Sequence, residues 1–216
     1  MLDNQLSRYG AVSRNLPELS PASKVFLVGD SDDTTVGSAN LGNEYPSDRD
    51  GVTRVYATIQ AAVNATRANA GDVVLVMPGY NQSLQGADSW NVAGVQVIGL
   101  GNGQNRSTLT FDTTGATVNL GADGVRVSNL RFLASVSAIT RGLDLDTGFF
   151  GQRVDNCYFQ YDTNGDDFVT VIRAGAKHSR IEDNYIAMEP DTTGPSYGIS
   201  LLGGDPDYTT IQRNTL

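Results

Sequence analysis

A repeat of 27 to 30 residues in the second part of the chain constrains the fold more than any other feature. Each repeat has an apolar anchor residue, followed by a short polar pair and a turn. The anchors are separated by 30, 27, 27 and 30 residues and are Val97, Val127, Val154, Ile181 and Ile211. Between them lie short segments in which two apolar residues flank a polar one, namely Val118–Leu120, Leu143–Leu145, Val169–Val171 and Ile199–Leu201. This alternation is typical of strands with one buried face.

A unit of this length with two or three short strands cannot bury its apolar face alone, so successive units must stack. Stacked coils form parallel sheets around a continuous apolar interior. We therefore expect an all-β fold, a right-handed parallel β-helix of about five or six coils, with the five anchors in one column. Asn129 and Asn156 share one turn position, where Asn tolerates left-handed backbone and can hydrogen-bond its equivalent about 4.8 Å away in the next coil. The competing interpretation is a leucine-rich repeat, whose period overlaps but whose L-x-x-L-x-L pattern is absent.

The segment before the repeat predicts one helix. Apolar residues at helical spacing indicate an amphipathic helix over residues 56–69, and the apolar run Val73–Met77 suits a strand buried on both faces. We expect the helix to cover the apolar end of the first coil, so that a capping segment and the β-helix together occupy residues 24–216. The polar residues 1–23 are expected to form an N-terminal arm. Since the sequence stops within a recognisable coil, we expect either another subunit to cover Leu216 or the protein to continue past it.

Composition narrows the function by exclusion. The net charge of −9 argues against a nucleic-acid partner because phosphates would be repelled. No run approaches the roughly 18 consecutive apolar residues of a membrane helix, so no membrane partner is expected. The single cysteine, Cys157, falls at a core position of the repeat, and the single histidine, His178, falls at a polar turn. We expect a buried thiol and a surface imidazole, with no cofactor.

Two groups of acidic residues are candidates for chemistry. Asp144 and Asp146 share one face of a strand about 7 Å apart, a spacing that suits an inverting glycosidase. Solvated carboxylates on the outside of a strand are the favoured interpretation. Asp162, Asn164 and Asp166 repeat the first three oxygen ligands of a calcium loop, but the sixth position is not Gly and the twelfth is not Glu. An Asx-rich turn is therefore favoured over a metal site, and no catalytic residue is assigned.

Two further features have a functional and a structural interpretation. Trp90 could stack on a sugar, but a single aromatic residue at a loop edge more often packs. The glycine-rich stretch Gly99–Gly103 resembles a phosphate-binding loop only superficially, because no helix follows it. We expect this stretch to form a tight turn between coils.

Several stretches resemble known β-helical proteins. YATIQAAVNAT and GDVVLVMPGYNQSL are similar to the opening of pectin-lyase-fold proteins, including pectin methylesterases, where a helix precedes the first coils. The series PSDRDGVTRVYATIQAAV, VVLVMPGY, AGVQVIGLGNGQNRSTLTFD and VRVSNLRFLA more specifically resembles a family of β-helical virion proteins of tailed bacteriophages. The resemblance covers residues 24–216, and Ile98–Arg106 is its most specific block. The methylesterase motifs are not kept: CYFQYDTN has a Gln and an Asp that are not adjacent, and no second motif is present.

The virion-family resemblance implies a non-enzymatic particle protein. The expected role is a capsid decoration or cement protein that forms homotrimers on the exterior of the phage particle. Residues 1–23 are expected to contact the major capsid protein or other virion proteins. The alternative is a tail spike or fibre component that binds or cleaves host surface polysaccharide.

Overall fold

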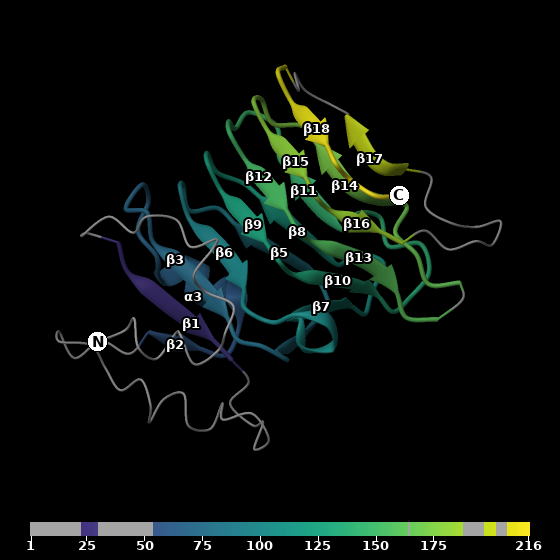
Figure 1. Cartoon of the computed structure of the whole chain (residues 1–216), viewed down its shortest axis with the longest axis horizontal. Helices are drawn as coiled ribbons and strands as arrows, with labels where there is room; N and C mark the ends of the chain where they lie inside the picture. Colours follow the sequence, from purple (N-terminus) through teal and green to yellow (C-terminus); the bar gives the residue numbers. More distant parts are fainter. Residues whose placement is uncertain (1–22, 30–53, 164, 188–196, 202–206) are drawn as a thin grey trace.

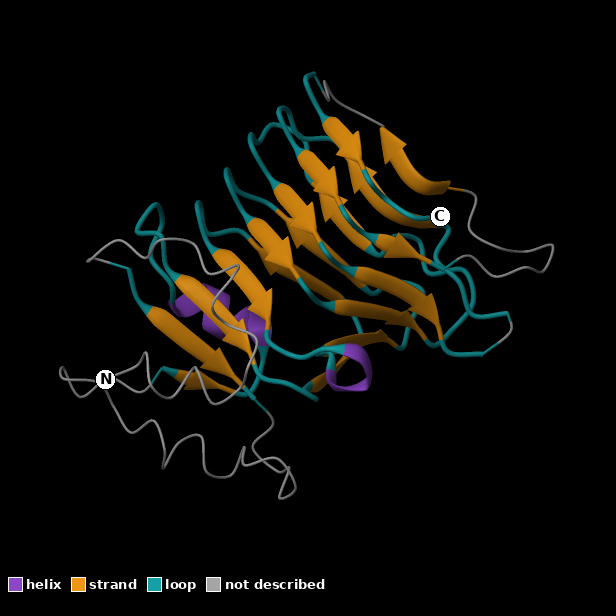
Figure 2. Ribbon diagram, in the orientation of Figure 1, coloured by secondary structure: helices purple, strands orange, loops and turns teal. Residues whose placement is uncertain are grey.

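Three parallel sheets wind around one axis and form a right-handed parallel β-helix (Figures 1 and 2). The computed structural model describes residues 23–29, 54–163, 165–187, 197–201 and 207–216. Sheet A has eight strands, and sheets B and C have five strands each, which gives about five complete coils. The fold class predicted from the repeat is confirmed.

Each complete coil contributes one strand to each sheet. Sheet A contains β1 (Val25–Val28), β2 (Val55–Tyr56), β3 (Val73–Val76), β6 (Gln96–Gly99), β9 (Arg126–Ser128), β12 (Arg153–Asp155), β15 (Arg180–Glu182) and β18 (Thr210–Gln212). Sheet B contains β4 (Asn81–Leu84), β7 (Thr108–Phe111), β10 (Arg131–Ala134), β13 (Tyr158–Tyr161) and β16 (Tyr185–Ile186). Sheet C contains β5 (Ala87–Trp90), β8 (Thr117–Leu120), β11 (Leu143–Leu145), β14 (Thr170–Ala174) and β17 (Tyr197–Leu201).

The anchor residues of the repeat lie in one column inside sheet A. The strand registers pair each anchor with the next one along the chain, in the order Val97, Val127, Val154, Ile181 and Ile211. The first four side chains are fully buried, whereas Ile211 is 41% exposed on the last described strand of the sheet. A second column in sheet B contains Leu109, Phe132, Phe159 and Ile186. The interior is therefore a set of apolar stacks, one for each sheet.

The register of β14 differs from the one that the sequence suggested. Leu143 pairs with Ile172, and Leu145 pairs with Ala174. The sequence repeat had instead aligned Leu143–Leu145 with Val169–Val171. The observed register places Arg173 opposite Asp144, where the two side chains form an ion pair. This pairing lies on the outside of the sheet, so the spacing of apolar residues alone did not show it.

The turns between sheets A and B hold the backbone in the left-handed region at successive coils. Asn129 has φ 59° and Asn156 has φ 53°, and the Asn156 side-chain amide donates to Oδ1 of Asn129 at 3.0 Å. The Asn129 amide in turn donates to the carbonyl oxygens of Gly99 and Gly101, at 2.7 and 3.0 Å. The equivalent left-handed positions in the last two coils are Asp183 and Arg213. These side-chain bonds tie each turn to the preceding coil.

Helix α3 (Ile59–Ala65) is shorter than the predicted helix over residues 56–69. It begins after Thr58, whose hydroxyl accepts a hydrogen bond from the backbone N–H of Ala61. It ends at Thr66, which has extended backbone and a hydroxyl that donates to the carbonyl of Val63. The predicted ends were wrong because these two threonines form local caps. The helix packs against β1, β2, β3 and β5, and so covers the first coil.

Truncating one member of the sheet B column tests whether the stack supports the fold. Phe132 is fully buried, and its ring stacks on that of Phe159 with centroids 4.8 Å apart and planes 12° apart. Phe132→Ala is expected to lower the free energy of unfolding by about 3–5 kcal/mol, because it leaves a cavity between coils. Urea denaturation measures this change. The control is Leu133→Ala on the outer face of the same strand, where we expect a much smaller loss; equal losses would contradict the stacked core.

Candidate functional site

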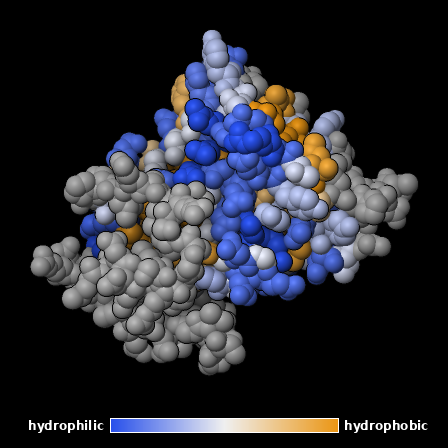
Figure 3. Space-filling model, in the orientation of Figure 1, coloured by the Kyte–Doolittle hydropathy of each residue, from blue (hydrophilic) through white to orange (hydrophobic). Residues whose placement is uncertain are grey.

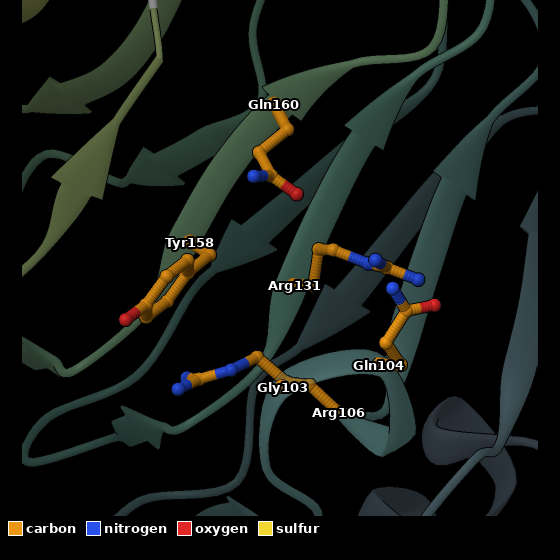
Figure 4. A pocket seen from close by; sticks show the side chains of 6 residues that line it. All are labelled: Gly103, Gln104, Arg106, Arg131, Tyr158 and Gln160. Carbon is orange, nitrogen blue, oxygen red and sulfur yellow. The ribbon is translucent and has the colours of Figure 1, made fainter.

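A hollow of about 330 Å³ lies on the outer face of sheet B. Figure 4 shows the six residues that line it: Gly103, Gln104, Arg106, Arg131, Tyr158 and Gln160. Strand alternation explains their positions, because the residues between the core-facing members of β10 and β13 must point outward. The 3₁₀ turn Gly103–Asn105 forms one wall. Seen from this side, the surface over β10 and β13 is largely hydrophilic (Figure 3).

Arg106 is held at the base of the hollow. Its Nη1 donates to the backbone carbonyl of Asn156 at 2.7 Å, and its Cζ lies 3.9 Å from the centroid of the Tyr158 ring. The residue is only 7% exposed, yet among the described residues no carboxylate forms an ion pair with it. Burial and the nearby charge of Arg131 lower the pKa of the Arg106 guanidinium, and Tyr158 partly opposes this effect. A guanidinium remains protonated in proteins, so Arg106 is a buried cation.

Arg131 provides a second positive charge to the same hollow. It lies between Thr108 and Tyr158 in the strand register, and its Nε donates to the Thr108 hydroxyl at 2.9 Å. Figure 4 shows the remainder of its guanidinium extending toward Gln104. None of the six lining residues is acidic. The hollow therefore combines two guanidinium groups, two side-chain amides and a phenol ring.

Most buried carboxylates on the described part of the chain are paired with an arginine, whereas the buried Asp167 accepts a hydrogen bond from the backbone N–H of Ala138. Asp155, for example, accepts from both Nε and Nη2 of Arg126, at 2.8 and 2.9 Å. The further pairs that contain a buried carboxylate are Asp72 with Arg67, Asp144 with Arg173, and Glu182 with Arg213. A buried charge without an oppositely charged partner is costly, and Arg106 is the one cation among the buried residues of the described chain.

The Asp144 carboxylate is not solvated, so that expectation was wrong. Asp144 is 2% exposed, and guanidinium groups of Arg141 and Arg173 bind it at 3.0 and 2.5 Å. The parallel register brings Arg173 of the next coil directly against it. The Asp146 carboxylate instead accepts from the backbone N–H of Thr147. Both carboxylate oxygens of Asp144 therefore accept hydrogen bonds from arginine side chains, and the residue is almost wholly buried.

The calcium-loop candidates are only partly described. Asn164 lies outside the described residues, so the set Asp162, Asn164 and Asp166 is not tested as a whole. The Asp166 carboxylate accepts from both the backbone N–H and the hydroxyl of Thr163, at 3.2 and 2.7 Å. Within the described ranges, no group of three or more His, Cys, Asp or Glu residues is placed to hold a metal ion. Asp166 therefore stabilises the turn through its hydrogen bonds with Thr163.

The remaining candidates lie in different environments. Cys157 is fully buried, and desolvation raises the pKa of its thiol to about 12. His178 is exposed with φ 52°, and its ring stacks on Tyr208 with centroids 4.9 Å apart. Trp90 is fully buried on β5, not at a loop edge, so it cannot stack on a sugar. In the Gly99–Gly103 stretch, a Cβ at Gly101 would overlap the carbonyl of Asn105, which explains the glycine by close backbone approach.

Sequence reasoning did not find the hollow. Arg106 lies outside the repeat segments, and its contact with the Asn156 carbonyl joins residues 50 positions apart. The only available indication was an arginine within the glycine-rich block of the virion-family resemblance.

Comparisons with family models, with curated proteins and with solved structures find no match to this chain. Within the described residues, no helix has the length and apolar character needed to cross a membrane. The functional argument therefore depends on the residues themselves.

A second polar cluster lies beneath helix α3. The Tyr80 hydroxyl donates to Oε1 of Gln82, and the Gln82 side-chain amide donates to Asp88 at 3.2 Å. Burial raises the pKa of the Asp88 carboxyl, and the hydrogen bond from Gln82 only partly opposes this. Asp88 is therefore an acidic group whose ionisation works against folding.

Replacing Asp88 tests this cost of ionisation. Because its pKa is higher in the folded than in the unfolded state, the carboxyl favours folding most below about pH 3.9, its ordinary pKa. This stabilising contribution of the Asp88 carboxyl is lost as the pH rises through its raised pKa in the folded protein. We expect Asp88→Asn to be more stable than the natural chain at pH 7, with the difference shrinking or reversing at acidic pH. Thermal unfolding from pH 3 to 8 measures it, with the exposed Asp162→Asn as control; a destabilised Asp88→Asn at pH 7 would contradict the assignment.

Proposed function

We propose that the protein is a non-enzymatic structural subunit of a bacteriophage virion, a capsid decoration or cement protein that forms homotrimers on the particle exterior. The observation that carries the proposal is the unbroken register of the anchor column from Val97 to Ile211. This is the architecture that the virion-family resemblance implies. The residues of its most specific block also take part in the architecture, since Gly99 and Gly101 accept hydrogen bonds from Asn129 of the next coil.

The surface of the β-helix supports an external, assembled role. Ionic pairs along the outer faces join neighbouring coils, as Arg126 with Asp155 and Asp144 with Arg173 do. A net charge of −9 is compatible with an outer surface exposed to salt water.

Apolar side chains are exposed at the last described coil. Leu201 is 49%, Ile211 41% and Leu216 74% exposed. In Figure 3, hydrophobic surface gathers at this end of the molecule, near β17. The proposed trimeric state is inferred from the resemblance.

The proposed attachment element is the N-terminal arm, residues 1–23, of which residues 1–22 lie outside the described part of the chain. A polar segment with few core-forming residues gains order by lying on another surface, and the proposed surface is the major capsid protein or another virion protein. The β-helix would then be the exposed body and the arm its anchor.

Deleting residues 1–22 tests the anchor. We expect the truncated protein to lose attachment to virus particles, while its far-UV circular dichroism stays β-rich because the described strands begin at Val25. Co-sedimentation with particles that lack the protein measures attachment. The matched control carries an arm of the same length and composition in scrambled order, and it should also fail to attach.

Light scattering after size exclusion gives the oligomeric state in the same samples. The proposal expects three times the chain mass of 23.0 kDa. Full attachment of the truncated protein would overturn the role of the arm, and a monomer at working concentration would overturn the homotrimer.

A further inference from the structure

We propose that the hollow on sheet B binds an anionic sugar unit, carboxylated or sulfated, of an acidic glycan. The inference is independent of the virion proposal, because the site is complete within one described chain. It begins with the environment of Arg106, a cation that is 7% exposed and has no carboxylate partner among the described residues.

The charge of the hollow determines the sign of the ligand. Arg106 and Arg131 both line it, and their mutual repulsion is one cause of the lowered pKa of the Arg106 guanidinium. An anion between the two arginines would relieve this repulsion. It would also accept hydrogen bonds from the guanidinium N–H groups that are not already bonded to the Asn156 carbonyl or the Thr108 hydroxyl. Guanidinium groups bind carboxylate and sulfate-type oxyanions through two parallel hydrogen bonds, which a lysine ammonium cannot do.

The volume of the hollow and its uncharged lining residues indicate what kind of molecule carries the anionic group. A hollow of about 330 Å³ is much larger than a single small ion requires, and it is within the usual range for small-molecule sites. The amides of Gln104 and Gln160 offer both donors and acceptors, which suits a ligand rich in hydroxyl groups. The rings of Tyr158 and Tyr185, with centroids 5.5 Å apart, extend an aromatic surface to the next coil. This combination fits a charged sugar that continues into a chain.

Two other polyanions fit less well. A nucleic acid would meet a protein of net charge −9 with only two cations at the site, so long-range repulsion opposes its approach. An acidic peptide could add to a sheet only at a free strand edge, but β10 and β13 are each paired on both sides. The hollow also presents no apolar pocket that would hold a neighbouring peptide side chain.

Calorimetry with defined oligosaccharides tests the inference. The probes are a hyaluronan tetrasaccharide, a sulfated chondroitin tetrasaccharide, neutral cellotetraose, inorganic sulfate and a short poly-glutamate peptide. We expect at least one charged tetrasaccharide to bind roughly tenfold or more tightly than cellotetraose, and this preference to weaken as salt screens the charges. Backbone amide signals of Tyr158 and Gln160 should shift on its addition.

Variants locate the binding. Arg131→Gln is expected to weaken binding of the charged tetrasaccharide by roughly tenfold or more, since it removes one guanidinium but only one internal hydrogen bond. Arg106→Gln should have the same effect, and its thermal unfolding is measured alongside because Arg106 also packs on Tyr158. The matched control is Arg180→Gln, an exposed arginine on sheet A, which should bind as the natural chain does.

Several outcomes would overturn the inference. These are no binding of either charged tetrasaccharide, equal affinity for cellotetraose, tighter binding of sulfate alone or of the peptide, and equal weakening by Arg180→Gln. Sulfate alone would indicate a site for a small ion, and the peptide would indicate a protein partner. If Arg106→Gln fails to fold, Arg131→Gln decides the question, because its contacts within the chain are few.

Discussion

The stacking of inward side chains from one coil onto the next is the constraint on which the rest of this structure depends. Each anchor from Val97 to Ile181 is buried by the residues one repeat before and after it. Parallel backbone pairing fixes the register, and the register fixes which side chains face inward. Neither columns nor sheets could exist in a single repeat, so the fold is a property of the stack.

The same register decides what happens on the outside. Outward residues one repeat apart come side by side, which turns Asp144 and Arg173 into an ion pair and Tyr158 and Tyr185 into neighbouring rings. Most buried charges are neutralised by this arrangement. Arg106 is a buried cation outside this arrangement, because it reaches across two coils to the Asn156 carbonyl instead of to a carboxylate. This buried cation, which has no carboxylate partner among the described residues, is the feature on which the proposed ligand site rests.

The interior could be predicted from the sequence to the extent that it obeys a period. The anchor column and the left-handed turns at Asn129 and Asn156 follow from residue type and spacing, since both repeat once per coil. The helix ends could not be predicted, because they depend on side-chain caps at Thr58 and Thr66 that compete with the apolar pattern. The strand predicted at Val169–Val171 was out of register with β14, because the spacing of apolar residues fits more than one alignment. The observed alignment places Arg173 against Asp144 on the outside of the sheet.

The hollow could not be predicted, for a different reason. Its lining residues come from two strands and a turn, and none of them recurs at every repeat. Asp144 shows the same limit, since its burial by Arg141 and Arg173 depends on side chains meeting across coils. Periodicity identifies which residues face inward, but the contacts of outward residues depend on side chains from other coils and need the structure.

Methyl–methyl NOE spectroscopy on the chain with labelled Val and Ile methyl groups tests the central claim most directly. Adjacent coils are about 4.8 Å apart, so the account predicts cross-peaks that join Val127 to Val97 and to Val154. Val97 and Val154, which lie roughly 9.6 Å apart across two coils, should show no direct cross-peak. A spectrum in which Val127 contacts neither neighbour, or in which Val97 contacts Val154 directly, would contradict the stacked coil.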